Sequence, residues 1–230
     1  MDEPESILVI TPHPDDSESA AGGTIAKWCA EGKKVTLVVC TNGDKGTSDR
    51  SVDPAELAAT REKETLEAAR VYGLAGVEFL RFPDQGLEDT DEFRERLVWQ
   101  IRTHKPDLLL CIDPERKYIR HRDHYVSGRV ALDAAFPYSR DHLAYPEHLK
   151  QGVDTHKVEE IWLFRPQEPD TYIDVTDHFE TRQNALHSHF SQVGPRDPER
   201  DDRSRQRLAE TGKEIGVPLA ESFKRIEMFR

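Results

Sequence analysis

The stretch from residue 7 to residue 41, ILVITPHPDDSESAAGGTIAKWCAEGKKVTLVVCT, decides the fold. It begins and ends with apolar runs of strand length, Ile7–Thr11 and Val35–Thr41. Between them lies a helix-like stretch, Gly23 to Glu31, followed by Gly32, a residue that often ends a helix. Apolar strands with few interruptions are typical of parallel strands buried on both sides. The stretch therefore predicts a β-α-β unit.

The same alternation of short apolar runs and longer amphipathic stretches continues along the chain. Further strands are expected at Val77–Phe82, Leu108–Asp113 and Glu160–Arg165. A helix is expected over 53–73, where an Asp-Pro pair opens a long polar stretch. Two more are expected where apolar residues recur four apart, at Phe93, Leu97 and Ile101 and at Val126, Val130 and Ala134. This order predicts a three-layer, Rossmann-like α/β fold with a mainly parallel sheet and helices on both faces.

Length and composition limit the classes of protein that this chain can belong to. At 230 residues, with no repeat or flexible linker, one domain spanning residues 1–230 is expected. The charged region 195–207 is interpreted as a solvated loop that leads into the last helices. There are 44 acidic and 32 basic side chains, a net charge of −12, which argues against binding to nucleic acids or anionic membranes.

Cysteine usage and the beginning of the chain indicate a compartment. The three cysteines are too few and too scattered for a disulfide framework. No apolar run approaches the length of a membrane span, and Met1–Glu5 is acidic where a signal peptide is basic. We therefore expect a soluble cytoplasmic protein with reduced thiols.

The segment after the first predicted strand carries ionisable side chains where a nucleotide-binding fold would carry glycines. In open α/β sheets, ligands bind at the carboxyl ends of the strands, and here this position is occupied by His13, Asp15 and Asp16. A histidine and carboxylates repel phosphate and attract a cation. Pro14 followed by acids is equally typical of a helix start, so the motif by itself leaves open a helix cap or a metal site.

A second cluster follows the Leu108–Asp113 strand, in the sequence His121-Arg122-Asp123-His124. By itself it is more typical of a polar helix start. If the two strands are neighbours where the strand order reverses, however, three possible metal ligands meet, namely His13, Asp16 and His124. Three protein ligands leave one coordination position for water, as in catalytic zinc sites.

The remaining polar groups suit hydrolysis of an amide or ester. Zinc lowers the pKa of bound water to about 7, and Asp15 is placed to take the proton that the water loses. His121, held by Asp123, is expected to face the oxyanion of a tetrahedral intermediate.

These motifs together resemble the PIG-L/LmbE-like family of zinc-dependent de-N-acetylases, which act on N-acetylglucosamine conjugates. The resemblance is carried by PHPDDSESAAGGTIAKW at Pro12–Trp28 and by HRDH at His121–His124. It extends to TNGDKGTSD at Thr41–Asp49, to TREKETLEAARVYGLAGVEFLRFPDQG at Thr60–Gly86 and to ALHSHFSQ at Ala185–Gln192.

The resemblance implies a role for each matching position. His13, Asp16 and His124 match the ligands of one Zn²⁺ per chain, Asp15 the general base, and His121 the residue that stabilises the intermediate, with Asp123 behind it. Residues near the substrate are expected to be Arg61, Asp84 and His189. The family also implies an amino-sugar conjugate as substrate and a homo-oligomer, such as a hexamer.

Several alternatives remain open at this point. An arginine on a helix, as at Arg61, is more often a surface ion-pair partner, and a histidine beside Phe190 is more often a packed residue. The same metal site also suits an amidase that cleaves a larger N-acyl or thiol conjugate, or a non-catalytic metal-binding module. Histidine and carboxylate ligands accept iron, manganese or cobalt as well as zinc.

Overall fold

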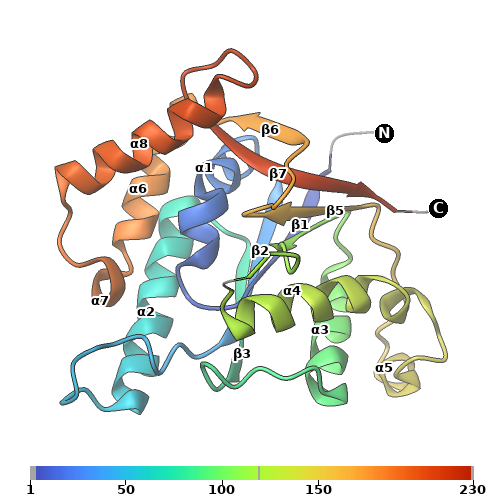
Figure 1. Ribbon diagram of the computed structural model, residues 1–230. Helices are drawn as coiled ribbons and strands as arrows, with labels where there is room; N and C mark the ends of the chain where they lie inside the picture. Colours follow the sequence, from blue (N-terminus) through green and yellow to red (C-terminus); the bar gives the residue numbers. More distant parts are fainter. Residues whose placement is uncertain (1–3, 119, 229–230) are drawn as a thin grey trace.

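Seven strands form a single sheet in the order β3-β2-β1-β4-β5-β7-β6 (Figure 1). The computed structural model describes residues 4–118 and 120–228. The strands are β1 (Ser6–Thr11), β2 (Lys34–Thr41), β3 (Gly76–Phe82), β4 (Leu108–Ile112), β5 (Glu160–Phe164), β6 (Thr171–Asp174) and β7 (Ala220–Glu227). Strands β1 to β5 run parallel to one another and correspond to the five predicted strands.

Strands β6 and β7 extend the sheet in the antiparallel sense and were not predicted. β7 pairs with β5 through Phe164 and Phe223, and β6 pairs with β7 at the edge. The sequence of β6, TYID, is short and half-buried, and most of the outer half of β7 is also only partly buried. Neither segment forms the continuous apolar run by which buried parallel strands are recognised.

Helices cover both faces of the sheet. They are α1 (Asp16–Ala30), α2 (Pro54–Tyr72), α3 (Asp91–His104), α4 (Arg122–Ala135), α5 (Pro146–Lys150), α6 (Phe179–His187), α7 (Phe190–Val193) and α8 (Pro198–Gly212), with the 3₁₀ turns η1 (Tyr138–Arg140) and η2 (Thr176–His178). Helices α1, α2 and α6 pack together on one face, and α3 packs with α4 on the other. Within the described residues, no helix is both long and apolar enough to cross a membrane.

Alternate residues of each central strand enter different cores. In β1, Ile7 and Val9 join the core under α1 and α2, whereas Leu8 and Ile10 join the core under α3 and α4. This period of two places an apolar side chain on each face in turn. The three-layer arrangement expected from the sequence is therefore confirmed.

The charged region 195–207 is mostly helical, which corrects the expectation of a solvated loop. Helix α8 begins after Asp197, whose carboxylate accepts a hydrogen bond from the Glu199 backbone N–H, and Pro198 occupies the first turn. Ser204 and Leu208, four residues apart, are buried on the inner side. These buried positions, with Gly212 four residues further on, are too few among the many charges to be recognised in the sequence as an apolar stripe.

The strand order reverses between β1 and β4. From β1 the chain moves outward through β2 and β3, then returns through α3 to place β4 on the other side of β1. The segments that follow β1 and β4 thus lie side by side at the carboxyl edge of the sheet, the position at which open α/β sheets bind ligands.

Helix α4 approaches the end of β4 closely at Gly128. A Cβ atom added at Gly128 would collide with the carbonyl oxygen of Ile112 and would lie 3.1 Å from Cδ of Pro114. The absence of a side chain at this position lets α4 pack directly against the strand end.

We predict that Gly128→Ala destabilises the protein by about 1–3 kcal/mol in chemical denaturation, because the added methyl group overpacks this contact. Alanine otherwise favours a helix over glycine by about 0.5–1 kcal/mol, so the sign of the change is diagnostic. Arg129→Ala, at an exposed position on the same helix, is the control and should change stability by less than about 0.5 kcal/mol. An unchanged or higher stability of Gly128→Ala would contradict this account of the packing.

Candidate functional site

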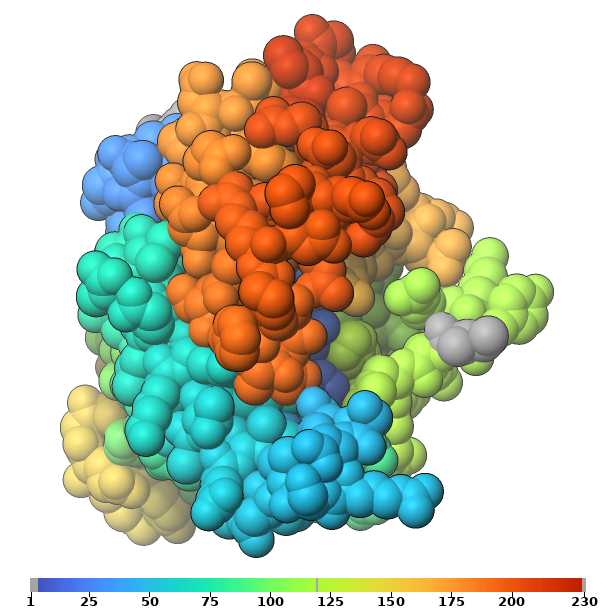
Figure 2. All heavy atoms as spheres, turned by 90° about the vertical axis from the view of Figure 1, so that its left-hand side faces the viewer, coloured from blue at the N-terminus to red at the C-terminus, as the bar shows by residue number. Residues whose placement is uncertain are grey.

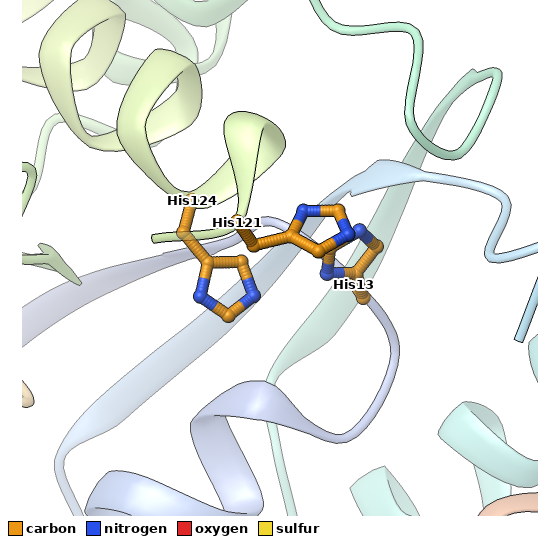
Figure 3. Close-up of side chains that lie close together, drawn as sticks. All are labelled: His13, His121 and His124. Atoms are coloured by element: carbon orange, nitrogen blue, oxygen red, sulfur yellow. The ribbon is translucent and has the colours of Figure 1, made fainter. Parts of the chain in front are cut away.

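Three histidine side chains converge where the two strand ends meet (Figure 3). His13 lies in the loop between β1 and α1, whereas His121 and His124 lie at the start of α4. The ring centroids of His13 and His121 are 4.7 Å apart, and those of His13 and His124 are 5.2 Å apart. One ring nitrogen of each of the three lies within 4.8 Å of the others, a spacing that suits a shared metal ion. The two clusters therefore meet as the sequence predicts.

The Asp16 carboxylate links the two segments. Its Oδ2 atom lies 3.0 Å from Nδ1 of His13 and 3.0 Å from Nε2 of His124. Burial alone would raise the pKa of Asp16, but the hydrogen bonds from His124 and His13 lower it well below its usual range. Asp16 is thus an ionised carboxylate in contact with both histidines.

His13 is surrounded by three carboxylates. Its Nε2 atom lies 3.1 Å from Oδ1 of Asp84 and 3.2 Å from Oδ2 of Asp123, while Nδ1 faces Asp16. An ionised carboxylate can only accept, so both ring nitrogens carry protons here. Burial would lower the pKa of His13, but the hydrogen bonds to Asp123, Asp16 and Asp84 raise it to about 11. The surroundings of this ring therefore favour a cation.

Asp84, which the resemblance places near the substrate, lies beside His13 in the structure. It is buried, and its Oδ2 atom accepts a hydrogen bond from the Lys45 backbone N–H at 3.3 Å. The backbone N–H of Asp84 donates to Asp44 Oδ1 at 3.1 Å, which folds the loop after β3 back toward the site. Burial would raise the pKa of Asp84, but the contact with His13 lowers it to about 2.

Asp15 adopts a left-handed backbone conformation, with φ of 98°, immediately before α1. His13 and Asp16 are therefore joined by a sharp turn, and Asp16 is the first helical residue. One carboxylate oxygen of Asp15 lies 3.2 Å from the Arg61 guanidinium, and the side chain remains a quarter exposed. Burial, and then the charge of Asp16, raise the pKa of Asp15 to about 6, against the lowering effect of Arg61.

Arg61 is buried, so it is not the surface ion-pair partner that a helical arginine usually is. Its guanidinium donates to the carbonyl oxygens of Gly43 at 3.0 Å and Pro14 at 2.5 Å, in addition to its contact with Asp15. A Cβ atom at Gly43 would lie 2.5 Å from Nη1 of Arg61, so this glycine leaves room for the guanidinium. Arg61 thus holds the segment that carries Asp15.

Asp123 contacts His121 through its backbone, while its carboxylate faces elsewhere. The carboxylate accepts hydrogen bonds from the backbone N–H groups of Gln85 at 2.6 Å and Leu87 at 3.2 Å. The backbone N–H of Asp123 donates to Nδ1 of His121 at 3.2 Å. Because an N–H can only donate, Nδ1 must accept, and neutral His121 carries its proton on Nε2.

The electrostatic surroundings also favour neutral His121. Burial lowers its pKa, and the positive charge of His13 lowers it further. His121 therefore presents a neutral N–H donor at the site.

His189 lies behind the site rather than on its surface. It is fully buried, and its Nε2 atom lies 3.2 Å from the buried Glu18 carboxylate. The packed position is therefore the one observed, and in this structure the side chain has no surface with which to touch a substrate.

The site opens into a cleft of about 230 Å³. In Figure 2 the dark blue N-terminal segment is visible at its floor, between the blue segment that precedes α2, the orange segment around α7 and the yellow-green segment that precedes α4. The cleft is also lined by Lys45, Gly46, Gln85 and Gln192, none of which the sequence analysis named as a site residue. Gln192 is the last residue of the quoted ALHSHFSQ segment, and its Nε2 donates to the Gly46 carbonyl oxygen at 3.0 Å.

Relatives of known structure share this architecture. An N,N'-diacetylchitobiose deacetylase from Pyrococcus horikoshii, solved with an inhibitor, superimposes with a TM-score of 0.90 at 30% identity, covering 98% of this chain and 85% of that one. A conserved protein from Thermus thermophilus superimposes with a TM-score of 0.80 at 26% identity, covering 98% of this chain and 96% of that one.

Curated relatives and a family model agree with the structural comparison. A diacetylchitobiose deacetylase from Thermococcus kodakarensis is 31% identical over 82% of this chain and 70% of its own length. A mycothiol S-conjugate amidase from Streptomyces coelicolor is 27% identical over 82% of this chain and 83% of its own length. The family model described as PIG-L, GlcNAc-PI de-N-acetylase, matches residues 8–135, the part of the chain that supplies β1 to β4 and every histidine of the site. The chain therefore belongs to the PIG-L family of LmbE-like de-N-acetylases.

Proposed function

We propose that this protein is a zinc-dependent hydrolase that removes the N-acetyl group from an N-acetylglucosamine-type conjugate. The observation that carries the proposal is the convergence of His13, Asp16 and His124 at the strand-order reversal, with Asp15 open to the same cleft. Relatives described as diacetylchitobiose deacetylases support the substrate class.

The residues present fit a divalent metal ion. His13 and His124 offer imidazole nitrogens and Asp16 offers a carboxylate oxygen, a donor set typical of catalytic zinc. The three carboxylates around His13 leave an excess of negative charge that a divalent cation compensates. When bound, zinc supplies a water of lowered pKa and polarises the carbonyl of the amide.

The other residues then have roles that follow from their positions. Asp15 accepts the proton that the attacking water loses, and Arg61 holds Asp15 by contacting both its carboxylate and the carbonyl oxygen of Pro14. His121 donates from Nε2 to the oxygen that gains negative charge during the attack. Asp123 fixes the tautomer of His121 through its backbone N–H and the position of His13 through its carboxylate.

An amidase acting on a larger N-acyl or thiol conjugate is the second candidate. It is favoured by the similarity to a mycothiol S-conjugate amidase, and the arrangement around Asp15 and His121 would serve both reactions. A non-catalytic metal-binding module is the third. The Asp15 carboxylate is not one of the proposed metal ligands: it is open to the cleft and contacts no histidine among the described residues. Its presence argues against simple metal storage.

A homo-oligomer such as a hexamer and a cytoplasmic location remain predictions.

The reaction itself is tested by acetate release. We predict that the purified protein releases acetate from N,N'-diacetylchitobiose or N-acetylglucosamine, that a chelator abolishes the release, and that added zinc restores it. The assay should include substrates with longer N-acyl chains. Exclusive cleavage of the longer chains would favour the amidase, and a metal-loaded protein that cleaves neither would leave only the binding module.

Asp15→Asn should keep metal content at the wild-type level and lower kcat about 10²–10⁴-fold, because the amide keeps the shape of the carboxylate but cannot accept the proton. Asp49→Asn, at an exposed position of the loop before α2, serves as the control and should retain full activity. Wild-type turnover by Asp15→Asn would exclude this residue as the base.

His124→Ala should lose metal as well as activity, because the variant removes one of three proposed ligands. Loss of a residue that merely orients a ligand weakens metal binding roughly 10–100-fold, so loss of a ligand should exceed that range. Metal content measured by mass spectrometry should fall well below one per chain, while His142→Ala, an exposed histidine, should retain full occupancy. Full zinc occupancy in His124→Ala would show that the ligand set is wrong.

A further inference from the structure

One long polar side chain of the proposed catalytic cleft has its whole hydrogen-bonding capacity unused. Gln85 lines the cleft and is exposed, and its carboxamide forms no hydrogen bond within residues 4–118 and 120–228. By contrast, the side chain of Lys45 donates to a backbone carbonyl oxygen of the turn after β3, and that of Gln192 donates to one in the loop before α2. The Gln85 carboxamide therefore keeps its carbonyl oxygen and both its N–H donors for a ligand.

The backbone of Gln85 adopts a conformation that costs free energy for a residue other than glycine. In the turn formed by 83–86, the Gly86 N–H donates to the Pro83 carbonyl oxygen at 3.1 Å, and Gln85, at the third position, has a φ of 59°. A positive φ at the third position of a β-turn is typical of glycine and uncommon for a long side chain. Strained residues of this kind cluster at functional sites, so the conformation indicates that the side chain has a use.

The turn that carries Gln85 is fixed to the rest of the site. The Asp123 carboxylate accepts hydrogen bonds from the backbone N–H groups of Gln85 at 2.6 Å and Leu87 at 3.2 Å, and the Leu87 side chain is fully buried. The same carboxylate lies 3.2 Å from Nε2 of His13. The turn is thus held beside a proposed metal ligand, and only the Gln85 side chain has to be ordered when a substrate binds.

A neutral carboxamide suits the uncharged part of an amino sugar. Its oxygen accepts from a hydroxyl group and its N–H groups donate to a hydroxyl oxygen, so it can bind a sugar hydroxyl in either sense. The charged groups nearby are already paired with one another, as His13 is with Asp84 and Arg61 is with Asp15. Among these groups, the Gln85 side chain is the one that is free to recognise a hydroxyl group.

We infer that Gln85 is a specificity-determining residue whose carboxamide binds a ring hydroxyl group of the amino sugar. The inference rests on the proposed function, because it takes the cleft to hold the sugar beside the metal ion. Gln85 contacts the substrate and takes no part in the cleavage of the amide. The hydroxyl contact accounts for a glutamine at a turn position that a glycine would occupy without strain.

The test compares the methyl glycoside of N-acetylglucosamine with its 3-deoxy and 4-deoxy analogues. Acetate release by the zinc-loaded wild type should show kcat/KM about 3–10-fold lower for one of the two analogues, the range expected for one neutral hydrogen bond. The analogue that is discriminated against identifies the hydroxyl group. Equal kcat/KM for all three substrates would overturn the inference.

Substitutions assign the discrimination to this side chain. Gln85→Met keeps the length of the side chain but cannot hydrogen-bond through an amide, so the ratio of kcat/KM between the methyl glycoside and that analogue should fall to about one. Gln206→Met is the matched control, because Gln206 is exposed on α8, and it should keep the wild-type ratio. A wild-type ratio in Gln85→Met would overturn the contact.

Gln85→Gly distinguishes a substrate contact from a role in folding the turn. Because glycine adopts a φ of 59° without strain, this variant should melt at the wild-type temperature or up to about 4 °C above it. It should nevertheless lose the discrimination between the methyl glycoside and the deoxy analogue. A lower melting temperature, together with an equal loss of kcat/KM for all three substrates, would show that Gln85 only shapes the turn.

A binding measurement separates this inference from the proposed function. In calorimetric titrations of the zinc-loaded Asp15→Asn variant, the methyl glycoside should bind about 3–10-fold more tightly than the same deoxy analogue, and Gln85→Met should abolish the difference. Such a difference, if the wild type released no acetate, would support the hydroxyl contact and contradict the deacetylase. Acetate release by the wild type with equal binding of all three sugars would do the reverse.

Discussion

The structure of the site depends on one buried carboxylate, Asp16, which lies 3.0 Å from His13, in the loop after β1, and 3.0 Å from His124, in the first turn of α4. Two segments more than one hundred residues apart meet at this atom. The parallel sheet makes the meeting possible, because β1 and β4 are neighbours and both end at the same edge. Removal of this carboxylate would leave the imidazoles of His13 and His124 without the charge that links them.

The groups around Asp16 are arranged so that each one restrains another. The Asp123 carboxylate binds backbone N–H groups of the loop after β3 and also faces His13, so it ties α4 to two other segments. Arg61 joins α2 to the turn that carries Asp15. Such mutual support is what a preorganised site requires, since each ligand or catalytic group keeps its position before a substrate binds.

Much of this arrangement could be predicted from the sequence. Continuous apolar runs identify the five parallel strands, and the rule that ligands bind at strand ends brings the His13 and His124 segments together. The burial of the Arg61 side chain was not predicted, because an arginine on a helix is usually exposed. Its spacing does carry a signal, since Leu57, Arg61 and Thr65 recur four apart and all three are buried.

Other features could not be read from local pattern. The position of Asp84 depends on a turn that folds back onto the segment after β2, and a contact of that kind leaves no periodic trace in the sequence. The carboxylate of Asp123 faces His13 rather than the adjacent His121, because two backbone N–H groups from a distant loop orient it. The left-handed turn at Asp15 and the burial of His189 likewise follow from tertiary packing.

The central claim is that one divalent ion binds at the reversal of strand order. It is tested most directly by anomalous diffraction at the zinc absorption edge, from crystals of the zinc-loaded protein. This account predicts a single peak about 2.0–2.2 Å from a ring nitrogen of His13, a ring nitrogen of His124 and a carboxylate oxygen of Asp16. A peak held instead by Asp84, His121 and Asp123, or no peak at this edge of the sheet, would contradict it.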